Sequence, residues 1–544
     1  MSTYQIGNYR QTYASFRLTR PERYNWAFDV FDRWAADPEK VAMRWVSDGG
    51  DVREVTFREF SRSSIRFANA LAGLGVEPGD RIFVMLPRIV EWWEVLLGGI
   101  RSRAVTVPGT TLLRHKDIVY RINASGASVA VTDAANADRI EAVRQDCPGL
   151  RHVIVVGGGA GCIGYEDLLA KSSPSMDHPR NPSTDPLMVY FTSGTTGPPK
   201  MVLNDHASYP KAHIITGKFW LDNRPTDLHW TLSDTGWAQA AWTCLFAPWN
   251  MGAAIFIWDH RGRFDAERTL RMLHDHPITT FFAPPTAYRM MVQEDLTRWP
   301  AKTLRHCLGA GEAVNPEVIA TWKGAMGHHI WEGYGQTETV LCVATFPGME
   351  YRPGSMGVAS PGFRMGVVDD SGNELGPGEE GEIAIRVRPE RPLGLFCGYY
   401  RNPEATTNCY VGDWYMTGDR ATRDEEGYFY FVSRADDVIN TSAYRVGPFE
   451  VESALLEHAA VAEVAVVGSP DPLRGEIIKA FVVLGQTARP SDELVRELQA
   501  HVRGVTAPYK YPREVEFIQE LPKTISGKIR RNELRRRELE KKSR

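Results

Sequence analysis

Hydroxyl groups, glycines and a lysine gather in one short stretch of the chain, TSGTTGPPK at Thr192–Lys200. Glycines let backbone N–H groups approach an anion closely, the hydroxyls add donors, and Lys200 adds a mobile positive charge. It is not a Walker A loop, because Met201 follows the lysine where Ser or Thr is required. A plain surface loop is disfavoured, because the apolar run Leu187–Phe191 comes directly before it. We therefore expect a polyphosphate cradle formed by Thr192, Ser193, Gly194, Thr195, Thr196, Gly197 and Lys200.

A second polar cluster, EGYGQTET at Glu332–Thr339, brings together an aromatic ring, a hydroxyl and a carboxylate. Tyr334 can stack on a purine, Thr337 can donate to an α-phosphate, and Glu338 can hold Mg²⁺, a hard cation that prefers oxygen ligands. On its own, the cluster is equally consistent with a polar turn around a packed tyrosine. Together with the first stretch, it favours a nucleotide site.

The composition is that of an enzyme-sized chain, with 544 residues, 43% of them apolar, and 63 basic against 67 acidic side chains. At about 150 residues per domain, this length predicts three or four compact units. The formal charge of −4 creates no field that would make nucleic acid or an anionic membrane the main partner. Seven cysteines without any Cys-x-x-Cys pair suggest neither a zinc cage nor a disulfide framework, and are typical of reduced thiols in a cytosol.

The sequence predicts no integral membrane segment, because no stretch approaches the ~18 to 20 uncharged apolar residues that span a bilayer. We expect a cytoplasmic protein. The N-terminus carries Arg10, Arg17 and Arg20 with no acid before Glu22, a faint resemblance to an organelle transit peptide. A mitochondrial matrix location in a eukaryote therefore stays open. The aromatic residues that continue into a patterned helix favour a packed N-terminal extension.

Short apolar runs alternate with helical patterns between residues 81 and 156. Arg81–Leu86 has the pattern of a buried strand, Val90–Arg101 that of a helix, and the alternation continues to a strand at His152–Val156. Strands at this spacing, joined by helices, predict a parallel or mixed sheet covered on both faces. A second α/β unit is expected at about 180 to 340 from the runs Leu187–Phe191, Ala254–Trp258 and Thr279–Phe282.

The pattern changes after about residue 345. Turn signals such as Gly376-Pro377-Gly378 separate short β-rich runs, which is typical of a small antiparallel, barrel-like subdomain. Beyond Arg434, helices at Val451–His458 and Ser491–Val505 alternate with strands in a shorter α+β unit. We expect an α/β protein with an N-terminal domain over 1–433, a hinge at 434–437 and a smaller, mobile C-terminal domain over 438–544.

Five stretches occur in one order and together resemble the adenylate-forming superfamily of acyl-CoA synthetases, luciferases and peptide-synthetase adenylation domains. They are TSGTTGPPK, GYGQTET, YMTGDR at Tyr415–Arg420, SRADDV at Ser433–Val438 and PKTISGK at Pro522–Lys528. The resemblance covers nearly the whole chain. Within the superfamily, Trp92–Trp93, Glu332–Thr339 and Tyr444–Pro448 look most like the medium-chain acyl-CoA synthetase branch.

The resemblance implies a first half-reaction in which a carboxylate attacks the α-phosphorus of ATP and pyrophosphate leaves. Two anions must meet, so neutralising their charge is the main catalytic task. By resemblance, residues 192–200 hold the β- and γ-phosphates, Thr337 contacts the α-phosphate and Glu338 binds Mg²⁺. Asp419 matches the carboxylate that accepts both ribose hydroxyls, and Arg434 assists it. The other implied nucleotide contacts are Gly311, Glu312, Ala313, Glu332, Gly333, Tyr334, Gly335 and Gln336.

Lys528 matches the lysine that, in the family, enters the site from the C-terminal domain and bonds the attacking carboxylate and the α-phosphate. A lysine suits this role as a compact charge on a flexible stem. Without the resemblance, the basic tail that begins at Lys528 would be interpreted as a solvated helix. Arg445 matches an arginine near the nucleotide phosphate or acyl group, and joins Lys528, Thr337 and Lys200 in the implied catalytic set.

The implied second half-reaction brings the thiolate of coenzyme A to the acyl-adenylate after the C-terminal domain rotates about Asp436. Ser442, Ala443 and Tyr444 match the thiol tunnel, and Arg474 matches a contact to a CoA phosphate. Many relatives have Gly in place of this alanine, so an adenylase that loads a carrier-protein thiol is the alternative. A binding module without catalysis is a further alternative, which the presence of both Lys200 and Lys528 disfavours.

The acyl-pocket positions matched by the resemblance are Trp237, Ala238, Ala310 and Gly335. Acetate-using relatives close this pocket with a Trp at the position of Gly335, so the glycine leaves it open. Trp242 and Trp249 are bulky enough to limit its depth, although ordinary core packing is their alternative. An apolar pocket discriminates a methylene by only about 1 to 3 kcal/mol, so we expect medium-chain, branched or aromatic acids. The partners are then the acid, ATP, Mg²⁺ and coenzyme A, and an oligomer stays possible.

Overall fold

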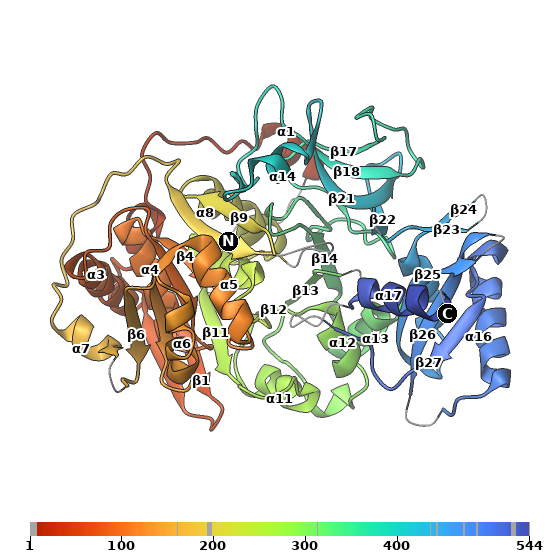
Figure 1. Cartoon of the computed structure of the whole chain (residues 1–544), viewed down its shortest axis with the longest axis horizontal. Helices are drawn as coiled ribbons and strands as arrows, with labels where there is room; N and C mark the ends of the chain where they lie inside the picture. Colours follow the sequence, from red (N-terminus) through yellow and green to blue (C-terminus); the bar gives the residue numbers. More distant parts are fainter. Residues whose placement is uncertain are drawn as a thin grey trace.

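The structure is a computed structural model, which describes residues 8–159, 162–192, 199–312, 314–435, 437–441, 444–471, 474–485, 488–523 and 529–542. Within these ranges the side chains of Asn440, Tyr444, Arg445 and Pro508 are not described. Figure 1 shows a large N-terminal body with a smaller C-terminal unit at its right. Four sheets build the two parts, and the expected α/β class with a large N-terminal and a smaller C-terminal domain is confirmed.

The first sheet of the body has eight strands and a parallel centre. Its central strand β3 (Arg81–Met85) is mostly apolar and almost wholly buried. This is typical of a parallel strand that is covered on both faces of the sheet. Across the sheet the strands are β19 (Gly398–Tyr399), β9 (Met201–Asp205), β8 (Pro186–Phe191), β4 (Val105–Pro108), β3 (Arg81–Met85), β5 (Ala127–Asp133), β6 (His152–Val156) and β7 (Ile163–Gly164). The helices of this part are α3 (Phe57–Gly73), α4 (Val90–Ser102), α5 (His115–Ser125), α6 (Ala137–Glu141) and α7 (Tyr165–Ala170).

The second sheet has nine strands, parallel through its middle and antiparallel at both edges. In order they are β16 (Val358–Ala359), β15 (Val343–Ala344), β14 (Ile330–Tyr334), β13 (His306–Ala310), β12 (Thr280–Phe282), β10 (Leu228–Thr231), β11 (Ala254–Asp259), β1 (Val41–Ser47) and β2 (Val52–Thr56). Its helices are α8 (Ser208–Ile215), α9 (Ala238–Ala241), α10 (Ala247–Asn250), α11 (Ala266–Asp275), α12 (Pro285–Met291) and α13 (Pro316–Met326).

The two α/β units do not divide near residue 180, as the apolar runs suggested. β8 and β9 extend the first sheet, whereas β1 and β2, from the beginning of the chain, extend the second sheet. The prediction that a second unit spans about residues 180 to 340 was therefore wrong about which strands belong to it. An apolar run shows that a strand is buried, but its partner is chosen by packing across the whole body, which the local pattern does not contain.

A smaller antiparallel sheet forms the β-rich subdomain, as the turn signals predicted. Its strands are β17 (Met365–Val368), β18 (Gly381–Arg386), β21 (Trp414–Arg423), β20 (Tyr410–Val411) and β22 (Phe429–Arg434), and α14 (Pro403–Thr407) lies beside it. The short β19 between β18 and β20 leaves this sheet and pairs with β9 of the first sheet. This crossing ties the β-rich subdomain to the strand that follows Lys200.

The C-terminal unit is an α+β layer with its own apolar core. Its sheet contains β24 (Tyr444–Val446), β23 (Ile439–Thr441), β26 (Gly475–Leu484), β25 (Val461–Asp471) and β27 (Glu514–Phe517). Its helices are α15 (Pro448–Leu456), α16 (Asp492–Val505) and α17 (Arg531–Lys542). α17 corrects the interpretation of the tail as a solvated helix, because Leu534 and Glu538 on one of its faces are buried.

The N-terminal segment forms the expected packed extension. In α1 (Tyr9–Ser15), Tyr9 Oη donates to the carbonyl of Ala359 at 2.7 Å and Tyr13 Oη to that of Phe363 at 2.8 Å. These bonds fasten the segment to the chain between β16 and β17. Among the described residues, no helix combines the length and the apolar character needed to cross a bilayer.

Candidate active site

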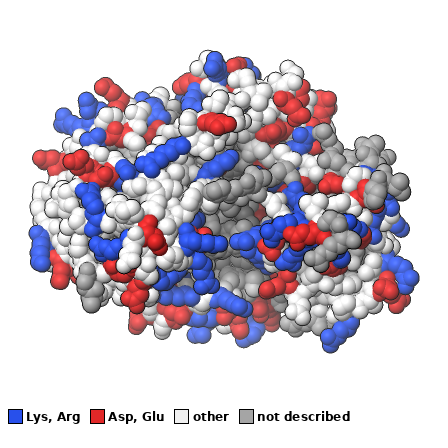
Figure 2. Space-filling model, in the orientation of Figure 1, with Lys and Arg blue, Asp and Glu red and all other residues white. Residues whose placement is uncertain are grey.

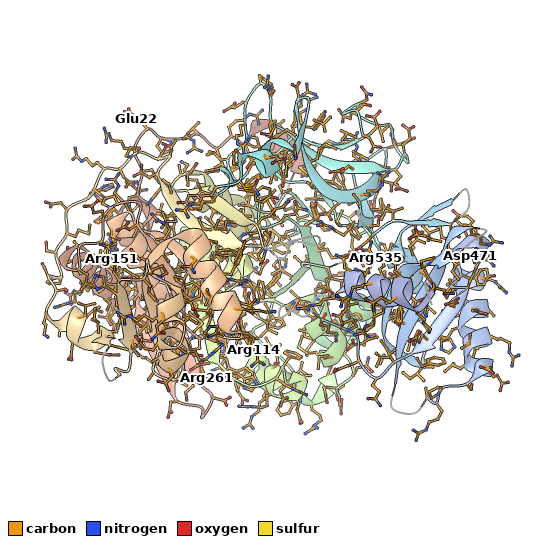
Figure 3. The ribbon with its side chains drawn as sticks, in the orientation of Figure 1. Glu22, Arg114, Arg151, Arg261, Asp471 and Arg535 are labelled. Carbon is orange, nitrogen blue, oxygen red and sulfur yellow. The ribbon has the colours of Figure 1, made fainter. Side chains whose placement is uncertain are left out.

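A cavity of about 1310 Å³ opens where the three parts of the N-terminal body meet. It is lined by residues at the carboxyl ends of β8, β10, β12 and β13, the edge at which open α/β sheets bind ligands. Figure 2 shows a hollow in the middle of the front face with Lys and Arg side chains around it. Arg114 and Arg261, labelled in Figure 3, lie below this hollow. The positive rim favours anionic ligands.

The polyphosphate cradle starts and ends at this cavity. β8 leads into Thr192 and β9 begins after Lys200, and the Thr192 N–H donates to the carbonyl of Lys200 at 2.9 Å. Both residues line the cavity. Of the residues expected in the cradle, Ser193, Gly194, Thr195, Thr196 and Gly197 lie outside the described part of the chain. The structure therefore places the two ends of the loop, and both face the site.

Asp419 on β21 is held at the cavity by side chains from another sheet. Its Oδ2 accepts hydrogen bonds from Tyr334 Oη at 2.7 Å and from Gln336 Nε2 at 2.6 Å. Arg434 on β22 pairs with Asp419 in the strand register, and its Nη1 lies 3.4 Å from Oδ1. Burial, and then the charge of Asp419, raise the pKa of Tyr334, so the phenol stays a donor. The carboxylate is thus oriented before any ligand arrives.

Glu332 on β14 is a buried acid that lines the same end of the cavity. Its Oε1 accepts the Val314 N–H at 2.9 Å, and its Oε2 has no partner among the described residues. Burial raises the pKa of Glu332 to about 8, against a smaller lowering by the Val314 bond. A buried carboxyl with one unsatisfied oxygen can receive a donor from a ligand. Next to it, Gly333 has no room for a side chain, because an ideal Cβ would lie 2.6 Å from Trp220.

Glu338 lies at the phosphate end of the cavity beside Lys200. Tyr399 Oη donates to Glu338 Oε1 at 2.8 Å, and the Phe396 N–H donates to its backbone carbonyl at 2.8 Å. Burial raises the pKa of Glu338, while the Tyr399 bond and the charge of Lys200 act to lower it. Thr337 precedes it on the cavity wall. The described side chains contain no group of three His, Cys, Asp or Glu that could hold a metal.

Mg²⁺ fits this end of the site as an ion shared with a substrate. The one carboxylate of Glu338 is a hard oxygen donor and faces the cavity, and Mg²⁺ is commonly bound by one or two carboxylates together with substrate phosphates.

Tyr399, which donates to Glu338, was not predicted from the sequence. The only local signal was an aromatic pair after a glycine at Gly398–Tyr400, which is common in strands.

The wall near α12 carries the next predicted contacts. Gly311 and Glu312 line the cavity, and Glu312 lies 3.3 Å from Arg289 and 3.4 Å from Thr286. Gly311 has a φ of +98°, which L side chains rarely adopt. Ala313 lies outside the described residues. The backbone at Gly311 can therefore turn beside a ligand without a side chain in the way.

A further part of the cavity lining is apolar and aromatic. The predicted wall residues Trp237, Ala238, Ala310 and Gly335 all line it. Trp242 lines it too, whereas Trp249 is fully buried in the core, where its indole donates to the Ala42 carbonyl at 3.1 Å. An ideal Cβ at Gly335 would lie 2.5 Å from the Val340 carbonyl oxygen and 2.7 Å from Trp242 Cη2. Trp242 therefore occupies the space that the glycine leaves.

The residues predicted in the C-terminal unit are placed only in part. Lys528, Asp436, Ser442 and Ala443 lie outside the described residues. Tyr444 and Arg445 have a described backbone in β24, where Arg445 pairs with Asn440 of β23. Arg474 does not line the cavity, and its N–H donates to Asp471 at 2.9 Å. In Figure 3, Asp471 lies at the edge of the unit that faces away from the body.

The beginning of α17 lies on the other side of the unit, toward the cavity wall. Arg531 forms a two-point ion pair with Glu452, at 2.7 Å to Oε2, and lies 3.7 Å from Asp437. The charge of Glu312, across the domain boundary, acts on Arg531 as well. The segment immediately after residue 528 therefore fronts the N-terminal body in this arrangement. Arg474, by contrast, is absent from the residues that line the cavity.

The chain belongs to the AMP-binding enzyme family. The family model described as AMP-binding enzyme matches residues 30–400, and the model of the AMP-binding enzyme C-terminal domain matches residues 450–528. The first match alone covers more than half of the chain and includes both polar clusters that the sequence singled out. The protein is an enzyme of this family.

Similar proteins sharpen the assignment. The chain is 46% identical to acyl-coenzyme A synthetase ACSM3, mitochondrial, of Homo sapiens, covering 98% of this chain and 93% of the relative. It is 47% identical to ACSM5, mitochondrial, of Homo sapiens, with 95% and 91% covered. The solved anthranilate CoA ligase AuaEII in complex with anthranoyl-AMP matches with a TM-score of 0.88 at 31% identity, covering 95% of this chain and 98% of that one. The resemblance to the adenylate-forming superfamily and its medium-chain acyl-CoA synthetase branch is confirmed.

Proposed function

We propose that the protein is an ATP-dependent, AMP-forming acyl-CoA synthetase for medium-chain, branched or aromatic carboxylic acids. The observation that carries this proposal is one cavity lined by two unlike sets of side chains. One set is charged and contains Lys200, Glu338 and Asp419, and the other is aromatic and contains Trp237 and Trp242. A nucleotide and an acid that react with each other need this arrangement, and the relatives named as acyl-coenzyme A synthetases support the same reaction.

In the proposed first half-reaction, the body binds ATP and orients it. Asp419, held by Tyr334 and Gln336, receives the ribose hydroxyls with Arg434 beside it. Glu332 accepts the adenine amino group next to Gly311, Glu312, Ala313 and Gly333. Residues 192–200 hold the outer phosphates, and Thr337 donates to the α-phosphate. These groups align the α-phosphorus with the incoming carboxylate, so that much of the barrier is removed by positioning.

The roles of the charged groups follow from the reaction. A carboxylate that attacks a phosphate requires positive charge where negative charge accumulates. We assign this task to Lys200 at the outer phosphates and to Lys528 and Arg445 at the reacting centre. Mg²⁺, when bound with Glu338, would neutralise the leaving pyrophosphate. Lys528 would enter from the C-terminal unit, and the charge of Glu312 that acts on Arg531 supports this direction of approach.

The second half-reaction is proposed to need a different arrangement of the C-terminal unit. The domain scheme of 1–433, hinge 434–437 and 438–544, with Asp436 as pivot, is part of this proposal. Among the described residues, Arg474 does not line the cavity in the present arrangement. A rotation that exchanges the two faces of the unit would remove Lys528 and present Ser442, Ala443, Tyr444 and Arg474 to coenzyme A. Alternating two faces on one lid prevents either half-reaction from obstructing the other.

The acid class is proposed from the apolar end of the cavity. Trp237 and Trp242 offer flat apolar faces, and Ala238 and Ala310 leave room between them. A site of this kind suits a ring or a branched chain of moderate length. The solved relative that acts on anthranilate supports an aromatic acid among the substrates, and breadth across related acids is expected.

A panel of acids tests the proposal directly. Acetate, butyrate, hexanoate, octanoate, isovalerate, benzoate and anthranilate would each be incubated with the protein, ATP and Mg²⁺, with and without coenzyme A. We expect acid-dependent release of pyrophosphate and AMP, with repeated turnover only when CoA is present. ATP hydrolysis that ignores the acid would contradict the function. Transfer to a phosphopantetheinyl carrier protein, with free CoA inactive, would favour the alternative adenylase.

Location and partners complete the proposal. We propose action in the cytoplasm or, in a eukaryote, in the mitochondrial matrix, and the mitochondrial relatives support the second place. The proposed partners are small molecules rather than nucleic acid, and self-association is open to a sedimentation measurement. Cell fractionation with a tagged full-length chain distinguishes the compartments.

A further inference from the structure

Tyr399 lies between the two charged side chains at the phosphate end of the cavity. Its hydroxyl donates to Glu338 Oε1 at 2.8 Å, and its ring centre lies 4.7 Å from Lys200 Nζ. The tyrosine is almost fully buried but lines the cavity with both partners. One side chain therefore contacts the lysine through its ring face and the carboxylate through its oxygen.

The backbone holds all three residues in place. Tyr399 pairs with Val202 in the β19–β9 ladder, and the Tyr400 N–H donates to the Met201 carbonyl at 2.7 Å. β9, which carries this ladder, starts one residue after Lys200. The Phe396 N–H bonds the Glu338 carbonyl, and the Phe396 ring packs against the Tyr399 ring with centroids 5.0 Å apart. The orientation of the tyrosine is thus set by its own strand and by a packed neighbour.

Glu338 is half-buried and Lys200 is exposed, and their opposite charges would attract each other. No salt bridge joins either of them to another described residue. A direct pair between the two would occupy both groups. Tyr399 offers each group a separate partner, a ring face for the ammonium and a donor for the carboxylate.

We propose that Tyr399 is a positioning residue that keeps Lys200 and Glu338 apart and oriented before ATP binds. This inference rests on the proposed function, in which Lys200 serves the outer phosphates and Glu338 serves Mg²⁺. On binding, Lys200 exchanges the ring face for phosphate oxygens, which are stronger partners. The hydroxyl continues to hold Glu338, leaving the other carboxylate oxygen for the ion.

The two contacts can be removed one at a time. Tyr399→Phe keeps the ring and loses the hydroxyl, whereas Tyr399→Leu loses both. Tyr428→Phe is a matched control, because this buried hydroxyl donates to the Glu350 carbonyl at 3.1 Å and does not line the cavity. ATP affinity would be measured by calorimetry with Mg²⁺ and with EDTA. The Mg²⁺ concentration for half-maximal pyrophosphate release would be measured in parallel.

For Tyr399→Phe we expect the Mg²⁺ requirement to rise about tenfold, the loss of one hydrogen bond to a charged group, with ATP affinity in EDTA unchanged. For Tyr399→Leu we expect the same rise and, in addition, a loss of ATP affinity in EDTA of about fivefold, because the lysine loses its ring and pairs with Glu338. Tyr428→Phe should change neither quantity.

Four outcomes would overturn the inference. Tyr399→Phe could have the same Mg²⁺ requirement as the control Tyr428→Phe. Tyr399→Leu could have the same ATP affinity in EDTA as Tyr399→Phe. A lower melting temperature without either change would likewise assign Tyr399 to packing alone. In a Glu338→Gln background, Tyr399→Phe should have no further effect on the Mg²⁺ requirement, since contacting groups are not additive; a full additional rise would contradict action through Glu338. If the wild type releases no pyrophosphate with any acid, the proposed function fails, while calorimetry still reports on Tyr399.

Discussion

Acidic side chains are held differently in the two parts of the molecule. At the cavity of the N-terminal body, uncharged side chains donate to the acids: Tyr334 and Gln336 to Asp419, and Tyr399 to Glu338. Asp419 also has a basic group nearby, the partly exposed Arg434 at 3.4 Å. In the C-terminal unit, several acids are instead paired with bases of the same unit. Lys479, with its side chain 3% exposed, lies 2.7 Å from both Glu516 and Glu538.

The difference indicates a division of labour. An acid held by a neutral donor keeps its charge available for a ligand, whereas an acid in a buried ion pair is used by the fold. Arg531 with Glu452 fastens α17 to α15, and Arg535 with Asp437 fastens α17 to the end of the proposed hinge. We propose that the body presents a preformed site and that the unit moves as a rigid piece.

Lys528→Ala gives the largest effect we expect, because it removes the one ammonium group that the unit is proposed to bring to the reacting centre. Adenylation should fall by about 10³-fold, while acyl-CoA formation from a preformed acyl-adenylate survives. Pyrophosphate release measures the first step, and thioester formation from synthetic acyl-AMP measures the second. Equal loss of both steps would break the proposed division between the two faces of the unit.

Lys479→Met tests whether the unit is held rigid by its internal pairs. The substitution leaves the buried Glu538 without its cation, although Ser469 still donates to it at 2.8 Å. We expect the free energy of unfolding of the C-terminal unit to fall by about 3 to 5 kcal/mol, measured by circular dichroism in urea.

The chain offers a control for this prediction. Lys541→Met removes an exposed partner of Glu516 and should cost at most about 1 kcal/mol. All 15 tryptophans lie at or before Trp414, so their fluorescence reports on the N-terminal body and should show an unchanged midpoint. A fluorescence transition that shifts with Lys479→Met would show that the two parts unfold together.

Trp242→Leu tests the apolar end of the preformed site. The smaller side chain opens the space beside Gly335, so the kcat/KM ratio of octanoate to butyrate should rise about tenfold. Trp249→Phe is the control, because Trp249 lies in the core and should affect stability only.

Gly335→Trp tests the same pocket in the opposite direction. The new side chain has to displace Trp242 and the Val340 carbonyl, and should shift preference toward acetate or propionate. An unchanged chain-length profile in both variants would refute the pocket.

Glu332 supplies the smallest effect, a dependence on pH. The pKa of Glu332 is raised to about 8 in the folded state. Between the ordinary carboxyl pKa and pH 8, the folded state therefore keeps a proton on Glu332 that the unfolded state has released. Stability therefore falls as pH rises toward 8. Ionised Glu332 accepts the adenine amino group better, so ATP affinity should rise about fivefold from pH 7 to pH 8.5. Glu332→Gln should abolish the pH dependence of ATP affinity in calorimetry and of stability in melting experiments. A pH dependence that persists in this variant would show that another group causes it.

Much of this molecule could be predicted from the sequence because its chemistry lies in short contiguous stretches. The strands β3, β6 and β8 and the helix α4 were predicted to within about one residue by apolar patterning. The predicted cavity residues that are described, from Lys200 and Glu338 to Asp419 and Arg434, line one cavity. The membership of the sheets was not predictable, because strand partners are selected across the fold.

The kinds of groups present can be identified from the amino-acid order alone: a hydroxyl-rich glycine loop, an aromatic and acidic cluster, and a basic tail after Pro522. Which of these groups touch is fixed by the folding of the chain. Tyr334 meets Asp419 from 85 residues away, Tyr399 meets Glu338 from 61 residues away, and Trp242 covers Gly335. The physical reason is the short range of a hydrogen bond, about 3 Å, since such a contact depends on strand register and packing that no local pattern records.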